Sequence, residues 1–213
     1  MSSMIPRLKG KIAQLARRAW MKYAVGISRT LYRDDRRRLK RAYALQDPWH
    51  MDSPLEQYRF EKINGFIGRK LGRVGSILEI GSGEGHHTEK LLERCARVDG
   101  LEISPLAASR ARKRCPKAFF FEAAFPELPV GLTPPYDLVI ASEALYYIKD
   151  VPAALAAMDR LGRHCLVTFY QDQWERLSPY FKDFPEMASE SFSFGPASWK
   201  IFFWKPKNGP IHP

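Results

Sequence analysis

Three closely spaced glycines, followed by a carboxylate further along the chain, could bind a small polar ligand. Residues 77–85 (I-L-E-I-G-S-G-E-G) predict a strand, a tight turn and the start of a helix. Glycine has no Cβ, so it allows positive φ and a close approach to the backbone, and the following helix directs N–H groups towards the ligand. Residues 98–102 predict the next strand, and Glu102 at its end could accept both hydroxyls of a ribose. The pattern predicts a nucleoside site.

The spacing of the glycines bears on which nucleoside is bound. A dinucleotide fingerprint has the form G-x-G-x-x-G, whereas this chain has G-x-G-x-G followed by His86. The missing glycine argues against an NAD-linked oxidoreductase, which stays open as an alternative. A strand–helix–strand unit that binds no ligand is the other alternative.

Length and composition limit the classes of protein. The chain has 213 residues, 45% of them apolar, which suits one α/β domain with an extension. We expect no secretory leader, because no apolar segment follows the basic start, and no apolar run approaches the ~20 residues of a membrane-spanning helix. Cys95, Cys115 and Cys165 form no C-x-x-C, which predicts buried thiols in a reducing compartment. The spacing of His, Cys and Asp residues predicts no metal site.

The positive charge is concentrated near the N-terminus. The formal net charge is +11, and residues 1–46 hold 13 of the 34 Lys and Arg residues but 2 of the 23 Asp and Glu residues. We therefore expect residues 1–46 to be a basic helical extension of a domain over residues 47–213. Because that domain is balanced in charge, a nucleic-acid substrate is disfavoured.

Residues 1–33 contain no acid, and their apolar residues recur at three- and four-residue steps, which predicts an amphipathic helix. With Trp20 and Tyr23 at its margin, the basic helix would suit peripheral contact with an anionic membrane surface. Packing of its apolar face on the domain is an equal alternative. A transit peptide, or nucleic-acid binding by residues 36–41, is a lesser one. We expect a cytoplasmic protein, at the membrane surface if this helix binds lipid.

Strands and helices alternate along residues 47–213. Asp47-Pro48 ends the extension, and Ser53-Pro54 and Ser104-Pro105 are typical of helix starts. We expect helices over residues 54–70, 85–95, 104–115, 150–161 and 174–182, and strands over residues 76–81, 97–102, 118–123, 136–141, 164–170, 190–194 and 198–205. This order predicts an α/β fold, with a mostly parallel sheet covered by helices on both faces and an antiparallel C-terminal hairpin.

Residues 137–148 (D-L-V-I-A-S-E-A-L-Y-Y-I) add a second motif to the glycine turn. Together the two motifs resemble those of class I S-adenosylmethionine-dependent methyltransferases, and S-E-A-L-Y-Y is closest to the nodulation-type (NodS-like) N-methyltransferases. Residues 47–54 and 56–59 are similar to the N-terminal lid of that family, which we place at residues 47–70. The resemblance covers residues 47–206. It implies a Rossmann-like fold, S-adenosyl-L-methionine as cofactor, and a small-molecule or carbohydrate acceptor such as the amino group of an amino sugar.

The resemblance also implies roles for residues at matching positions. The implied cofactor pocket is formed by Trp49, Arg59, Glu79, Gly81, Gly83, Gly85, Glu102, Ala123, Ala124 and Ser142. Within it Glu102 would hold the ribose hydroxyls. Arg59 and Trp49 would approach the methionyl end, where the guanidinium of Arg59 would pair with a carboxylate. An exposed helix cation and a packing aromatic are the alternatives for these two residues.

One position departs from the family pattern. An acid after the third strand usually contacts the adenine amino group, and Ala124 stands there in this chain. The loss of one hydrogen bond would weaken binding by about 0.5–1.5 kcal/mol. Glu122 is a candidate substitute, although strand alternation points it elsewhere. Ala124 also favours one alternative function, a catalytically weak cofactor-binding accessory protein. Another alternative, a nucleic-acid methyltransferase, is favoured by the basic extension alone.

Glu143 and Tyr147 are the candidate catalytic residues, because they follow the fourth strand, at the sheet edge where ligands bind. Glu143 would orient the acceptor or take its proton, and Tyr147 would form an aromatic wall facing the methyl group. Simple packing at a helix start is the alternative for the tyrosine. We expect His86 and His87 to lie on the surface of the first helical turn, and the alternative is that one of them borders the cofactor carboxylate.

Overall fold

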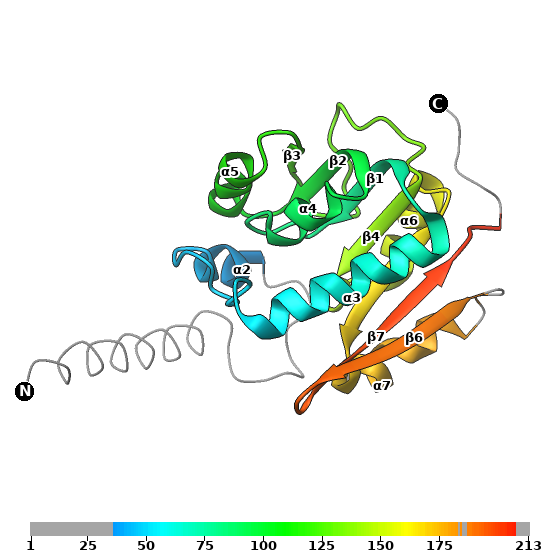
Figure 1. The fold of residues 1–213 in the computed structure, drawn as a ribbon. Helices are drawn as coiled ribbons and strands as arrows, with labels where there is room; N and C mark the ends of the chain where they lie inside the picture. The colour runs from blue at the N-terminus through cyan, green and yellow to red at the C-terminus, as the bar shows by residue number, and fades with distance from the viewer. Residues whose placement is uncertain (1–35, 183, 185–186, 208–213) are drawn as a thin grey trace, which may run out of the picture.

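The computed structural model describes residues 36–182, 184 and 187–207, so the helix expected within residues 1–33 lies outside the described residues. Seven strands form one sheet in the order β3-β2-β1-β4-β5-β7-β6 (Figure 1). Their bounds are β1 (Val74–Ile80), β2 (Cys95–Glu102), β3 (Phe119–Glu122), β4 (Leu138–Ser142), β5 (Cys165–Tyr170), β6 (Ala188–Phe194) and β7 (Ala197–Trp204).

The strand directions confirm the predicted architecture. Neighbouring strands from β3 through β5 are parallel. β7 is antiparallel to β5, and β6 and β7 form the expected antiparallel hairpin. β1 lies between β2 and β4, so the strand order reverses there. Ligands of open α/β sheets bind outside the carboxyl ends of the strands at such a reversal.

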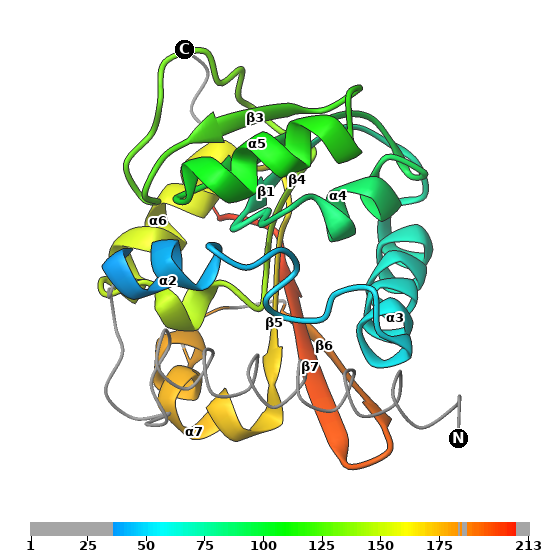
Figure 2. The same cartoon turned by 90° about the vertical axis from the view of Figure 1, so that its left-hand side faces the viewer.

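Helices cover both faces of the sheet (Figures 1 and 2). Side chains of a strand alternate between the two faces, so Ile77 packs with α3 (Pro54–Leu71) and α4 (His86–Leu91). Leu78 faces the opposite way and packs with α6 (Val151–Leu161). α5 (Pro105–Arg114) contributes Ala111 to a small cluster on β3. The short α2 (Arg36–Ala42) precedes the predicted lid.

The helix starts follow the predicted capping residues. Ser53, Ser104 and Asp150 each accept a hydrogen bond from a backbone N–H in the first turn of α3, α5 and α6, and a proline stands at the beginning of each helix. This arrangement satisfies an N–H that has no partner within the helix.

Some boundaries differ from those expected. α4 ends at Leu91 rather than near residue 95, because β2 already begins at Cys95, which pairs with Val74. The helix expected over residues 174–182 is a short α7 (Trp174–Leu177) between two 3₁₀ turns, Gln171–Gln173 and Ser178–Phe181. A proline at position 179 lacks the N–H that would continue the helix. Among the described residues, no helix has both the length and the apolar character needed to cross a membrane.

Candidate functional site

A cavity of about 320 Å³ is formed by the carboxyl ends of β1 and β4 and by the segment that leads into α3. Its lining includes these residues predicted from the sequence: Trp49, Arg59, Glu79, Gly81, Gly83, Glu102, Ala123, Ala124, Ser142, Glu143 and Tyr147. Gly85 does not line it. The structure therefore brings together residues from the lid, from the glycine turn and from the ends of several strands.

The glycine turn is held against the end of β2. The N–H groups of Gly81 and Ser82 donate to the carbonyl of Leu101, at 2.8 and 3.1 Å. Gly81 has φ of 73°, and a Cβ there would lie 2.7 Å from the Cβ of Ala144. Only glycine fits at this point, because the turn needs both a positive φ and close contact with the chain that follows β4.

Gly85 serves helix packing rather than the pocket that the resemblance implied for it. Its φ is 82°, and a Cβ would lie 3.2 Å from the Cα of Ala111 in α5. Its carbonyl accepts a hydrogen bond from the thiol of Cys115. The absence of a side chain at Gly85 therefore allows the start of α4 to lie close to α5. This contact determines the direction of the first turn of α4.

Glu102 ends β2 and is buried beside the glycine turn. Its two carboxylate oxygens accept from the N–H groups of Gly83 and Ser104, both at 2.8 Å. Burial raises the pKa of Glu102 to about 7, although these hydrogen bonds act in the opposite direction. The carboxylate is thus fixed in place while its remaining lone pairs can accept further hydrogen bonds.

Glu79, on β1, lies at the other side of the turn with His87. Burial raises the pKa of Glu79 to about 8, although Thr88 donates to its carboxylate. His86 and His87 are buried, so the expectation that they lie on the surface is wrong. His87 stacks on Phe60 of α3, with ring centroids 4.8 Å apart, because α3 covers the first turn of α4.

Burial, together with the charge of Arg59, holds the pKa of His87 well below its usual range, which favours the neutral imidazole. Neither ring nitrogen has a hydrogen-bond partner within the described part of the chain, and the same holds for the hydroxyl of Ser82. Both side chains line the cavity. Buried polar atoms are normally paired, so these two groups suit a ligand with polar atoms.

Arg59 lies in α3 and is almost fully buried, with a side-chain exposure of 2%. Its Nε donates to the carboxylate of Glu56 at 2.6 Å, and one terminal nitrogen donates to the hydroxyl of Ser142 at 2.7 Å. The alternative of an exposed helix cation is therefore wrong. Arg59 is also the one Lys or Arg side chain among the described residues that line the cavity.

A chain of hydroxyls connects Arg59 to Glu143. Ser142 Oγ lies 3.2 Å from Thr168 Oγ1, and Thr168 Oγ1 donates to Glu143 Oε1 at 3.1 Å. Since Ser142 accepts from Arg59, its own proton is free for Thr168, and each hydroxyl proton then points towards Glu143. Hydrogen bonds arranged head to tail in this way polarise one another.

Glu143 directly follows β4, is half-buried and has φ of 55°. Its second oxygen accepts from the N–H of Tyr170 at 3.1 Å and from the hydroxyl of Tyr146 at 3.2 Å. Burial raises the pKa of Glu143 to about 7, and the nearby Arg59 works against this increase. Glu143 therefore combines a fixed orientation with a pKa suited to proton transfer near neutral pH.

Four aromatic side chains lie next to one another along the cavity wall. Tyr43 and Trp49 have ring centroids 6.5 Å apart, Trp49 and Tyr147 are 6.2 Å apart, and Tyr147 and Tyr146 are 4.6 Å apart. Tyr43 and Leu39 come from the segment that we assigned to the basic extension, and they were not predicted as site residues. The basic composition of that segment gave no indication that it borders a cavity.

The end of the cavity near β3 is apolar. Ile103, Ala123, Ala124 and Phe125 line it. Glu122, the candidate substitute for the missing acid, is exposed and pairs with Arg112 at 3.2 Å, so it points away from the cavity. The structure thus contains no carboxylate at this end of the cavity among its described residues, which leaves backbone groups and apolar contact for any ring bound there.

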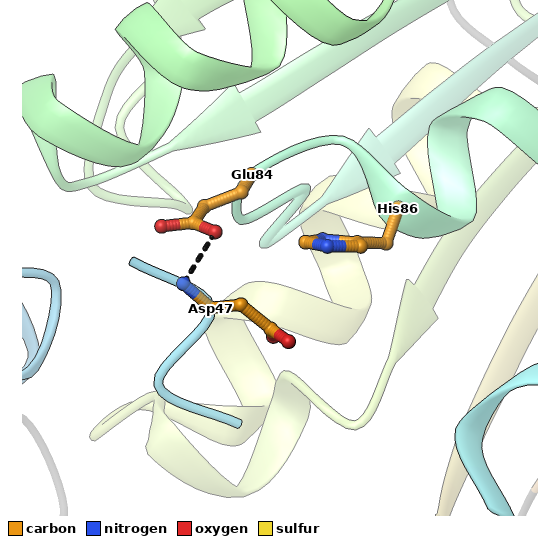
Figure 3. A group of neighbouring side chains, drawn as sticks. All are labelled: Asp47, Glu84 and His86. Carbon is orange, nitrogen blue, oxygen red and sulfur yellow. Dashed lines mark hydrogen bonds between the residues drawn. The ribbon is translucent and has the colours of Figure 1, made fainter. Parts of the chain in front are cut away.

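Asp47, Glu84 and His86 are brought together by the fold, although their spacing predicts no metal site (Figure 3). One ligand atom from each lies within 4.8 Å of the others. These atoms already have partners: Glu84 accepts from the N–H of Asp47 at 2.8 Å and from Arg110, and Arg114 lies 2.9 Å from His86 Nε2. The cluster therefore connects the predicted lid to α4 and α5.

The sequence of this chain is similar to those of known proteins. The family model "Nodulation protein S (NodS)" matches residues 32–167. Nodulation protein S of Bradyrhizobium diazoefficiens is 33% identical over 125 residues, which are 58% of this chain and 59% of that protein. Nodulation protein S of Sinorhizobium fredii is 30% identical over 125 residues, 58% of this chain and 57% of that protein.

A solved structure extends the comparison of the fold. The N-methyltransferase NodS from Bradyrhizobium japonicum WM9, in complex with S-adenosyl-L-homocysteine, has a TM-score of 0.66 and 21% sequence identity. The match covers 79% of this chain and 96% of that one. By sequence, this chain spans less than two thirds of the length of the curated relatives it matches. The match of the family model to most of its residues shows that this chain belongs to the Nodulation protein S (NodS) family.

Proposed function

We propose that this protein transfers a methyl group from S-adenosyl-L-methionine to the amino group of a small-molecule or carbohydrate acceptor, such as an amino sugar. The observation that carries the proposal is the set of carboxyl groups that line the cavity, which a cationic ligand would hold in their ionised form. They belong to Glu56, Glu79, Glu84, Glu102 and Glu143, and Arg59 supplies one guanidinium among them. Such a lining suits a sulfonium amino acid, which brings positive charge and one carboxylate. It also suits a protonated amine, which brings positive charge alone.

The donor and acceptor groups fit each part of this cofactor. Glu102 would accept hydrogen bonds from the ribose hydroxyls, and the apolar wall at Ala123 and Ala124 would contact the adenine ring. Arg59 would pair with the methionyl carboxylate. The ring nitrogens of His87 have no hydrogen-bond partner among the described residues, although Nδ1 lies 3.6 Å from Glu79, and they would give the buried end of the cavity further polar contacts.

When bound, the cofactor supplies a methyl group whose carbon–sulfur bond breaks as the bond to the acceptor nitrogen forms. An amine must lose a proton before its lone pair can attack, and the carboxylate of Glu143 would accept that proton. The hydroxyls of Thr168 and Tyr146 hold this carboxylate in one orientation. Tyr147 and Trp49 would exclude water and align the acceptor, which is the main contribution that such a displacement needs from a protein.

Titration calorimetry with S-adenosylmethionine tests the cofactor assignment. Glu102→Gln should weaken binding roughly tenfold to hundredfold, because hydrogen bonds to a charged group are lost. Glu122→Gln is the matched control, since Glu122 pairs in register with Glu102 on the neighbouring strand but is exposed. An unchanged affinity of Glu102→Gln would remove the ribose assignment.

Methyl transfer to defined acceptors tests the second half of the proposal. With radiolabelled cofactor, we expect label on glucosamine and none on glucose or N-acetylglucosamine, which lack a free amine. Glu143→Gln should lower kcat while leaving the affinity for the cofactor near that of the wild type. Cofactor binding without transfer to any amine would favour the accessory protein instead.

A further inference from the structure

Glu56 occupies a position in α3 from which a different contact is expected. Residues 53–56 (S-P-L-E) have the form of a capping box, in which the glutamate bonds back to the N–H of the capping residue. Here the N–H of Ser53 donates to the carbonyl of His50 at 2.9 Å instead. The carboxylate of Glu56 is turned into the cavity, where it is buried.

Two groups, one from α3 and one from the end of β5, hold this carboxylate. Oε2 accepts from Arg59 at 2.6 Å, and Oε1 accepts from the hydroxyl of Tyr170 at 3.4 Å. Tyr170 ends β5, and its N–H donates to Glu143. Tyr170 thus contacts both carboxylates, Glu56 through its hydroxyl and Glu143 through its N–H, and Glu56 also contacts the guanidinium proposed to bind the cofactor. Its negative charge adds to burial in raising the pKa of Glu143.

Arg59 is proposed above to pair with a ligand carboxylate, yet Glu56 already takes its Nε and one terminal nitrogen. A carboxylate from the cofactor would compete for the same guanidinium, since both present the same chemical group. Glu56, once released, would be a second buried carboxylate near Glu143. Two carboxylates side by side favour a cation between them, and an ammonium group has three N–H donors with which to bridge them.

We infer that Glu56 is a specificity-determining residue for the acceptor, which changes partner when the cofactor binds. The methionyl carboxylate replaces Glu56 on Arg59, and Glu56 then joins Glu143 in binding the ammonium group of the acceptor. The inference rests on the proposed function and adds to it an order of binding, cofactor before acceptor. It also explains why Glu56 does not accept a hydrogen bond from the N–H of Ser53.

Two nucleosides separate the effect of the amino-acid end of the cofactor from that of the rest of it. S-Adenosylhomocysteine carries the amino and carboxylate groups, and 5′-methylthioadenosine lacks both. By calorimetry, glucosamine and ethanolamine should bind at least about fivefold more tightly in the presence of S-adenosylhomocysteine than of methylthioadenosine, which is the lower end of typical coupling between sites. N-Acetylglucosamine should show no such difference.

The Glu56→Gln variant should lose this coupling while binding S-adenosylhomocysteine at least as tightly as the wild type, because a competing charge is removed. If Glu56 only held Arg59 in place, the variant would instead bind S-adenosylhomocysteine more weakly than the wild type. Glu61→Gln, an exposed position on the same helix, is the matched control and should keep the coupling. The Tyr170→Phe variant keeps the Glu56–Arg59 pair and should weaken the binding of the amine only. It replaces Glu56→Gln in the experiment if that variant does not fold.

Equal amine affinity with both nucleosides in the wild type would overturn the inference, as would full coupling in Glu56→Gln. If S-adenosylhomocysteine failed to bind the wild type, the proposed function itself would fail. Binding of the nucleoside without coupling would remove the role of Glu56 alone.

Discussion

Glu79, Glu102 and Glu143 are carboxyl groups of one cavity, and burial raises the pKa of each, to about 8, 7 and 7. Their surroundings differ although the direction of the shift is the same. Glu102 is held by backbone N–H groups, Glu79 by Thr88, and Glu143 by a hydroxyl chain that starts at Arg59. A cationic ligand would favour the ionised form of all three, so binding and proton release should be coupled.

The raised pKa of Glu143 predicts a pH dependence of activity. Its carboxylate form is the proton acceptor, and below about pH 7 the group is increasingly protonated. We expect kcat/KM to fall as pH decreases through this range, and kcat/KM reports ionisations of the free enzyme. In a Glu143→Gln variant the remaining activity should lose the part of this inflection that Glu143 contributes, and the parts due to Glu102, whose pKa is also about 7, and to the acceptor amine should remain. A wild-type profile with the same inflection as the variant would contradict the role of Glu143.

The raised pKa of Glu79 predicts a pH dependence of stability. The pKa is 4.5 for the unperturbed group and about 8 in the folded protein, so between these values the folded state holds a proton that the unfolded state has released. The contribution of Glu79 to the free energy of unfolding is therefore present below the unfolded pKa and is lost as pH rises through the folded pKa.

Glutamine cannot ionise, so Glu79→Gln should lose less stability than the wild type between about pH 5 and pH 8. Thermal unfolding of the ligand-free proteins, followed by circular dichroism, measures this difference. Glu61→Gln, an exposed site, should follow the wild-type curve. Parallel curves for Glu79→Gln and the wild type would contradict the prediction.

At the scale of elements, α5 holds the segment that closes the cavity. Arg110 donates to the carbonyls of Tyr43 and Leu45, at 3.0 and 2.9 Å, and to Glu84 in the glycine turn. Glu84 in turn accepts from the N–H of Asp47. One guanidinium therefore connects the chain after α2 to the start of α4.

Arg110→Met should loosen this segment, because two carbonyls and a buried carboxylate lose their donor. We expect faster hydrogen exchange over residues 43–51 and roughly tenfold weaker binding of S-adenosylmethionine, with a small change in the unfolding temperature. Arg112→Met on the same helix is the control, because Arg112 pairs with the exposed Glu122. Unchanged exchange in Arg110→Met would show that the segment is held by other contacts.

The sequence was sufficient for features that depend on local order. Caps such as Ser53 and Ser104 bond to their own helices, and the alternation of strands and helices determines the layers. The short α4 was not predictable, because the register of β2 against β1 ends it. Side-chain periodicity contains no information about that pairing.

Prediction of the candidate site was limited in the same way. Residues beside the glycine turn were recognisable, because their neighbours in the sequence carry the motif. Tyr43 reaches the cavity through contacts with residues more than 60 positions away, such as Arg110. The partners of Glu56 and His87 likewise depend on how α3 lies over α4 and β5.

At the scale of the whole molecule, the excess of basic residues and the carboxylates of the cavity lie in different parts of the sequence. The excess of basic residues lies in residues 1–46, whereas the cavity lining is rich in carboxylates. The boundary predicted at residue 46 separates Leu39 and Tyr43 from the other residues that line the cavity. We propose that residues 1–33 contact an anionic membrane surface and that the segment from residue 36 onwards belongs to the cofactor site.

Two truncations distinguish these roles. Deleting residues 1–35 should leave the affinity for S-adenosylmethionine unchanged and abolish co-sedimentation with phosphatidylglycerol vesicles, whereas phosphatidylcholine vesicles should bind neither form, because the attraction is electrostatic. Deleting residues 1–46 should in addition weaken cofactor binding roughly tenfold or more, since the apolar contact of Leu39 and Tyr43 is lost. Vesicle binding that survives the shorter deletion would contradict the membrane role of residues 1–33. Full cofactor affinity after the longer deletion would show that the cavity closes without Leu39 and Tyr43, which are the described residues before residue 47 that line it.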